Sequence, residues 1–171
     1  IVELLRSGEI LMKPLHLLGL VFSHGAVLGV GFALGIYFLP ILIAPASPTT
    51  SEIQTVARSH QFQGEFTRDL ADSDALHWGE GTITIGAQSV SFSGELAPGP
   101  DYQLYLSPEF VETETDFVRL KDQMTLIGPV KTFDRFLLEL PAGVDAGSYK
   151  AVIIWCETFG EFITAATYTR H

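Results

Sequence analysis

The most hydrophobic part of the chain is a continuous run near its N-terminus, from Leu15 to Ala44, that contains no Lys, Arg, Asp or Glu. A transmembrane helix needs about 20 apolar residues, whereas the apolar region of a secretory signal has only about 7–15. Ala44-Pro45-Ala46 resembles the cleavage site of such a signal, but the run is longer than a signal requires. We therefore expect residues 15–44 to form a single transmembrane helix that stays attached and lies in the lipid bilayer.

Glycine is frequent in this run and is spaced for helix packing. Gly25 and Gly29 form one GxxxG pair, and Gly31 and Gly35 form a second. Small residues let the backbones of neighbouring membrane helices approach closely. At about 100° per residue, His24 falls on one narrow stripe with the second pair. The pattern predicts contact with other transmembrane helices of a membrane protein complex; the alternative is the ordinary tolerance of membrane helices for glycine.

His24 lies inside the predicted span, where ionisable side chains are rare and tend to face protein. We favour a hydrogen bond from its imidazole across a helix interface. The alternative is contact with a haem or chlorophyll-type pigment near His24. We expect no cofactor that is intrinsic to the chain.

The basic residues predict the orientation of the helix. Arg6 and Lys13 precede the span, and the next basic residue after it is Arg58. Because Lys and Arg are enriched on the cytoplasmic side, we expect residues 1–14 to form a cytoplasmic N-terminal segment. The protein would be a single-pass inner (cytoplasmic) membrane protein with a periplasmic C-terminal domain.

A short link follows the apolar run. Pro40, Pro45 and Pro48 are expected to end the helix. Thr49 and Glu52 have the spacing of a capping box, which marks the start of a helix. We therefore expect residues 45–60 to be a linker that contains a short amphipathic helix.

From residue 61 the pattern changes to short apolar segments between Gly, Pro and Asp, which is typical of β-strands. The run Ala151–Cys156 is apolar on both faces, as expected of a central strand. The predicted fold class is mainly β, an antiparallel β-sandwich or barrel-like domain preceded by a single transmembrane α-helix. The candidate strands are Glu65–Arg68, Gly81–Ile85, Val90–Phe92, Tyr102–Leu106, Phe117–Leu120, Met124–Gly128, Phe136–Leu140, Tyr149–Cys156 and Ile163–Tyr168.

The net charge of −10 comes from the part of the chain after the apolar run. A nucleic-acid partner is not expected, because binding phosphates needs a concentrated basic surface. The same acidic field would repel anionic lipid headgroups. The acidic run Glu109–Asp116 predicts a flexible solvated loop rather than an acid–base pair.

Few residues suggest chemistry. No Ser/His/Asp arrangement, phosphate-binding glycine loop or histidine metal motif is present, so we expect neither an enzyme nor a metal site. His77 and Asp101 are candidates for a binding rim, although Pro98-Gly99-Pro100-Asp101 is more simply a rigid turn in which glycine supplies the unusual backbone angle. Cys156 is the only cysteine, so the domain can form no internal disulfide. Its thiol is either an inert core group or a redox group.

Several motifs in residues 61–171 occur together in one order. They are Gly64-Glu65-Phe66, His77 followed by Gly79-Glu80-Gly81-Thr82, Pro98-Gly99-Pro100-Asp101-Tyr102, Leu104-Tyr105-Leu106, and Tyr149-Lys150 through Val152-Ile153-Ile154-Trp155-Cys156 with Phe159 and Phe162. In these motifs the region resembles the DM13 domain family. The resemblance implies an extracytoplasmic β domain with a proposed role in electron transfer, often beside cytochrome-type domains. It also implies that Cys156 is the family's candidate redox cysteine.

Three function hypotheses remain. We favour a membrane-anchored accessory subunit of a respiratory or photosynthetic electron-transfer complex, with a structural or docking role on the periplasmic side and no catalysis of its own. The second is a thiol-dependent redox or electron-transfer module that uses Cys156. The third is an extracytoplasmic ligand-binding or adhesion module that uses the rim near His77 and Asp101.

Overall fold

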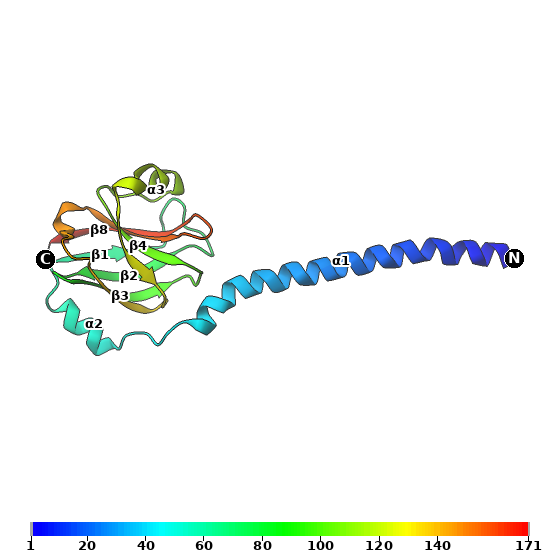
Figure 1. Cartoon of the computed structure of the whole chain (residues 1–171), viewed down its shortest axis with the longest axis horizontal. Helices are drawn as coiled ribbons and strands as arrows, with labels where there is room; N and C mark the ends of the chain where they lie inside the picture. Colours follow the sequence, from blue (N-terminus) through cyan, green and yellow to red (C-terminus); the bar gives the residue numbers. More distant parts are fainter. Residues whose placement is uncertain (1, 171) are drawn as a thin grey trace. The chain divides into compact units, whose positions relative to one another are not determined.

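The computed structural model describes residues 2–170, with side chains described from Pro14 onward. The chain divides into two compact units, Ile1–Leu39 and Pro40–His171. The first consists of helix, and the second contains the β domain (Figure 1).

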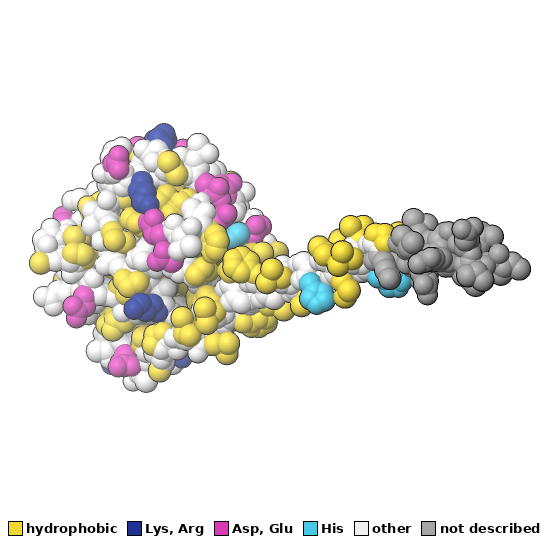
Figure 2. All heavy atoms as spheres, turned by 45° about the vertical axis from the view of Figure 1, so that its right-hand side comes forward, with side chains coloured by type: hydrophobic (Ala, Val, Ile, Leu, Met, Phe, Trp, Pro, Cys, Tyr) yellow, Lys and Arg dark blue, Asp and Glu magenta, His cyan; other side chains and the backbone are white. Residues whose placement is uncertain are grey.

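A single long helix, α1 (Val2–Ile43), contains the apolar run. Its segment Pro14–Ile43 has a mean hydropathy of 2.3, and none of its most apolar stretch is buried. Hydrophobic side chains cover most of its described part (Figure 2). The predicted apolar helix is therefore confirmed, and its length and composition suit a membrane anchor or a signal sequence.

The short helix α2 (Thr50–Ala57) begins at the predicted capping box. The Thr49 hydroxyl accepts a hydrogen bond from the backbone N–H of Glu52, and the Glu52 carboxylate accepts one from the backbone N–H of Thr49. Ile53 is the buried residue of α2. Just before α2, Arg135 Nε donates to the Pro48 carbonyl over 2.9 Å. The cap and this bond fix where the linker meets the β domain.

Eight strands of the described chain form one antiparallel sheet that curls into a nearly closed barrel (Figure 1). They are β1 (Phe62–Phe66), β2 (Gly79–Ile85), β3 (Ser89–Leu96), β4 (Tyr102–Ser107), β5 (Thr125–Val130), β6 (Arg135–Glu139), β7 (Ala151–Cys156) and β8 (Glu161–Arg170). The strand order is β5-β4-β7-β8-β1-β2-β3-β6, and the two end strands approach each other. The predicted barrel-like antiparallel fold is confirmed.

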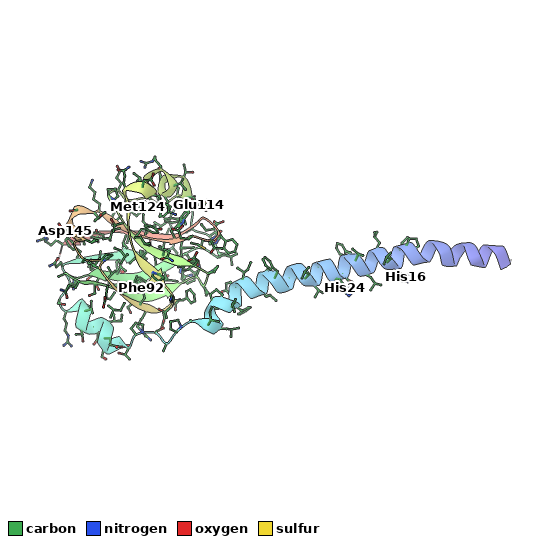
Figure 3. All side chains as sticks on the ribbon, in the orientation of Figure 1. His16, His24, Phe92, Glu114, Met124 and Asp145 are labelled. Carbon is green, nitrogen blue, oxygen red and sulfur yellow. The ribbon has the colours of Figure 1, made fainter. Side chains whose placement is uncertain are left out.

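Alternate residues of the strands fill the barrel interior. Phe92, labelled in Figure 3, is fully buried there and stacks on Phe136 with 5.1 Å between the ring centroids. Other fully buried members of this interior are Ile83, Ile85, Val90, Leu104, Leu106, Val152, Ile154 and Ile163. The period of two in the sequence therefore separates interior from exterior, as expected for a small barrel.

Gly81 and Gly94 face each other on β2 and β3 at a point where the two backbones come unusually close. A Cβ on Gly81 would lie 2.5 Å from the Cα of Gly94. Gly81 also has φ of +133°, which other residues rarely adopt. This close approach requires glycine at both positions.

A second apolar cluster lies outside the barrel and is covered by α3 (Glu114–Leu120). Phe117 and Leu120 of α3 pack on side chains from the outer faces of β4, β7 and β8. These partners include Tyr105, Ile153, Trp155, Phe162 and Ala165. Strand β7 is therefore buried on both faces, which confirms the prediction made for Ala151–Cys156.

The prediction of a strand over Phe117–Leu120 is wrong, because these residues belong to α3. The Thr113 hydroxyl accepts a hydrogen bond from the backbone N–H of Asp116 over 3.2 Å and so caps the helix. Phe117 and Leu120 are three residues apart, which places both on one face of a helix. The end of the acidic run, Glu114–Asp116, is likewise helical rather than a loop. The other predicted strands coincide with observed ones, with shifted bounds.

Replacing Phe117 with alanine should destabilise the β domain strongly. The ring is fully buried and stacked 3.9 Å from Trp155, and truncating a buried Phe costs about 3–5 kcal/mol. Val118 of the same helix is exposed, so Val118→Ala should change the free energy of unfolding by less than about 0.5 kcal/mol. Chemical unfolding of the full chain in detergent micelles measures both free energies. Equal effects of the two substitutions would contradict the packing of α3 on the outer face of the barrel.

Candidate functional site

Cys156 ends β7 with its side chain in the barrel interior. The thiol donates a hydrogen bond to the Pro100 carbonyl, with 3.0 Å between sulfur and oxygen. The residue is only 2% exposed. Burial raises the pKa of the Cys156 thiol, and the nearby Asp101 carboxylate adds to the rise. In this conformation the thiol is a protonated core group.

The turn Pro98–Asp101 covers this end of the barrel. Its left-handed residue is Asp101, with φ of +53°, so the prediction that glycine supplies the unusual angle is wrong; an Asp adopts this conformation more readily than most residues. Gly99 is required for space instead, because an added Cβ would collide with the ring of Tyr102. The Tyr102 hydroxyl donates to the Ala97 carbonyl over 3.0 Å and holds the turn in place.

His77 and Asp101 each bind other partners. Nδ1 of His77 lies 3.1 Å from the Asp74 carboxylate. The Asp101 carboxylate accepts hydrogen bonds from Thr158 and Gln103, over 2.9 and 3.2 Å. Among the hydrogen bonds of residues 2–170, none joins the two side chains of the proposed rim. The rim near His77 and Asp101 therefore stays a prediction.

A pair of carboxyl groups joins α3 to β8. Glu114, at the start of α3 (Figure 3), shares a hydrogen bond with Glu161, and its backbone N–H donates to the Asp72 carboxylate over 2.7 Å. The shared bond raises the pKa of Glu114, and burial and the charges of Glu161 and Asp72 raise it further. No group of three or more His, Cys, Asp or Glu in the described chain is placed to hold a metal ion.

A polar and aromatic group that sequence analysis missed lies at the edge of the outer cluster. The Tyr105 hydroxyl donates to the Glu157 carboxylate, which also binds Lys121 Nζ over 2.6 Å. Phe117 contacts the Tyr105 ring and stacks on Trp155. Burial raises the pKa of Tyr105, and the bond to Glu157 raises it further. Burial opposes the ionisation of Glu157, but the bonds from Lys121 and Tyr105 outweigh it and lower its pKa.

On α1, His24 makes a local bond. The residue is labelled in Figure 3. Its Nδ1 lies 2.8 Å from the Leu20 carbonyl. Because a carbonyl only accepts hydrogen bonds, this bond puts the proton on Nδ1 and leaves Nε2 as an acceptor or metal ligand. The four glycines of the GxxxG pairs, Gly25, Gly29, Gly31 and Gly35, have open space where a Cβ would be. They are therefore not required for the packing of this chain on itself.

One surface hollow of about 880 Å³ lies between α2 and the loop after β6. It is lined by residues such as Val56, Leu137, Leu140 and Pro141, and Glu139 is the one ionisable residue of its lining. A binding site normally combines an apolar wall with several converging polar groups. The hollow has the volume of a small-molecule site but not that set of groups.

The Cys156 thiol should react slowly in the native protein. Because it is buried and its pKa is raised, alkylation by iodoacetamide needs local opening. We expect a rate about 100-fold or more below that of the denatured chain, which corresponds to an opening free energy of about 2.7 kcal/mol. Mass spectrometry of the full chain in detergent micelles measures the rate; native labelling as fast as denatured labelling would refute the buried thiol.

Replacing Glu114 with glutamine should stabilise the protein at neutral pH. In the native protein, the raised pKa of Glu114 means that folding favours its protonated form. The native protein therefore gains stability as pH falls through this folded-state pKa, and the gain is absent above it. The neutral amide removes the repulsion from Glu161 at neutral pH but also removes a favourable negative charge at the start of the helix. The net gain in the free energy of unfolding should be about 0.5 kcal/mol.

The gain from Glu114→Gln should shrink as pH falls, because protonation removes the same repulsion from the native protein. Asp122→Asn, at an exposed position outside the pair, is the matched control and should show no such trend. Thermal unfolding at several pH values measures both variants. A constant difference across pH would contradict the shared carboxyl pair.

Comparison with known proteins identifies the β domain. The model of one protein family, described as "Electron transfer DM13", matches residues 61–168, which is most of the chain and nearly all of the barrel. No curated protein and no solved structure matches the chain. The match confirms the resemblance seen in the sequence motifs, and the chain therefore belongs to the DM13 family, which is associated with electron transfer rather than with a known catalytic activity.

Proposed function

We propose that this protein is a membrane-anchored accessory subunit of a respiratory or photosynthetic electron-transfer complex. In this proposal α1 stays in the membrane with its N-terminus in the cytoplasm, and the β domain is periplasmic. The β domain has a structural or docking role beside the redox partners. The observation that carries the proposal is that one chain combines a domain of an electron-transfer family with an apolar helix long enough to span a membrane.

The surface of α1 supports a helix partner. His24, Gly31 and Gly35 share one face, and a Cβ on either glycine would meet nothing in this chain. Glycine lowers the stability of a helix interior by roughly 0.5–1 kcal/mol relative to Ala, so glycines without a local packing role are best explained by the close approach of another helix. Nε2 of His24 is then available to accept a hydrogen bond across that interface or, alternatively, to ligate the metal of a haem or chlorophyll-type pigment.

The β domain supports docking rather than catalysis. Its described residues hold no group arranged for metal binding, and its cysteine is buried under the Pro98–Asp101 turn. Acidic side chains are scattered over the face in Figure 2, and the chain carries a net charge of −10. Such a surface favours a partner with complementary basic patches, because opposite potentials steer association.

The proposal predicts that the full-length protein co-purifies with larger membrane proteins that contain redox cofactors. Gly31→Leu should remove most of the associated protein, because leucine blocks close helix approach. Gly19→Leu is the matched control: it lies on a different face of α1 and also has open space around it. Native gels, mass spectrometry and absorption spectra of material extracted in mild detergent measure the association.

Both variants must remain in the membrane fraction for this comparison to count, and alkaline extraction of membranes checks that they do. Wild-type protein found only as a free monomer in native membranes would refute the accessory-subunit proposal. Equal association of both leucine variants would place the helix contact on another face of α1.

A further inference from the structure

Three aromatic rings form a continuous path through the cluster between α3 and the barrel. The Tyr105 ring meets Phe117 edge-on at 5.3 Å, and Phe117 stacks on Trp155 at 3.9 Å with an interplanar angle of 10°. Tyr105, Phe117 and Trp155 are exposed by 6%, 0% and 3%. Tyrosine and tryptophan are the aromatic side chains most readily oxidised by one electron. Here Phe117 lies between them and contacts both rings.

Tyr105 has a base placed to take its proton. Its hydroxyl donates directly to one oxygen of the Glu157 carboxylate, and the other oxygen binds Lys121. Glu157 is ionised at neutral pH, since these bonds outweigh the opposing effect of burial on its pKa. The bond joins a neutral phenol to a charged carboxylate, so a proton released by Tyr105 has an acceptor already in hydrogen-bond contact.

The surrounding charge favours proton loss when an electron leaves. Lys121 Nζ lies 5.9 Å from the centre of the Tyr105 ring and 5.6 Å from that of Phe117. A positive charge created on these rings would be repelled by the nearby ammonium group. Transfer of the phenolic proton to Glu157 leaves a neutral tyrosyl radical and avoids that repulsion. The Glu157 side chain is 29% exposed, so the proton can continue to water.

We propose that Tyr105 is a proton-coupled one-electron redox site, with Glu157 as its proton acceptor and Phe117 and Trp155 as the adjoining electron path. The proposal deepens the proposed function, on which its biological setting rests. In the oxidation step one electron passes from Tyr105 to a high-potential oxidised metal centre of a partner protein. The phenolic O–H bond breaks, the proton forms an O–H bond with Glu157, and Tyr105 becomes a neutral radical. Return of one electron and one proton restores the phenol.

The test needs no partner. The full chain in detergent micelles is oxidised with photogenerated tris(bipyridine)ruthenium(III), with persulfate as the terminal acceptor. Electron paramagnetic resonance should show a tyrosyl radical in the wild-type protein and lose most of it in Tyr105→Phe. Tyr149→Phe is the matched control, because the Tyr149 hydroxyl bonds to Thr125 rather than to a carboxylate; this variant should keep the signal.

Glu157→Gln tests the role of the base, because the amide still accepts the hydrogen bond but does not take the proton. Oxidation of Tyr105 in this variant should slow by about 100-fold, the lower end of the contribution of a positioned base, and its solvent isotope effect should change. Both readouts are insensitive to a purely structural role and serve even if Tyr105→Phe folds poorly.

A radical signal unchanged in Tyr105→Phe, or oxidation in Glu157→Gln at the wild-type rate, would overturn the proposal. Either result would leave the accessory-subunit proposal untouched, because that proposal is decided by co-purification. Loss of co-purification with the radical chemistry intact would have the opposite meaning: Tyr105 would be a redox site, but not in the complex proposed.

Discussion

Burial of β7 on both faces is the constraint on which the β domain depends. All of Ala151–Cys156 is buried, although a barrel wall covers only one face of a strand. The inner face is covered by the opposite wall of the barrel, and the outer face has no cover except α3 and the segments beside it. Leaving Ile153 and Trp155 in water would forfeit roughly 1.5–3 kcal/mol for each side chain. Helix α3 is therefore part of the core.

The same alternation explains how far the fold could be predicted. Interior and exterior positions of a barrel strand alternate with a period of two, so short apolar segments predicted most of the sheet. The segment Phe117–Leu120 is an exception, because it is too short for strand and helix periods to be distinguished. The deciding feature is local, because the Thr113 hydroxyl caps the backbone N–H of Asp116. The role of Gly99 was also hidden, because it depends on where the Tyr102 ring lies.

The sequence identified candidate residues that are unusual in their own segment, but not those that only the fold brings together. Cys156 and His24 stood out because each is unusual in its own segment. The contact of Tyr105 with Glu157 and Lys121 joins β4, the residue after β7 and the residue after α3. No spacing along the chain encodes it. In the register of β4 and β7, Tyr105 lies opposite Ile153, and Trp155 is two residues farther along β7.

Trp155 and Cys156 are neighbours on β7 with opposite surroundings: Cys156 lies in the barrel interior, and Trp155 lies in the outer cluster with Tyr105. Removing an electron from a buried neutral group is costly unless a proton leaves with it. The Cys156 thiol donates to the Pro100 carbonyl, which accepts a hydrogen bond but does not take up a proton at neutral pH. Tyr105, on the Trp155 side, donates to an ionised carboxylate at the protein surface. If an electron leaves this domain without opening of the Pro98–Asp101 turn, electrostatics favours its loss on the outer face of β7 over loss from the cysteine.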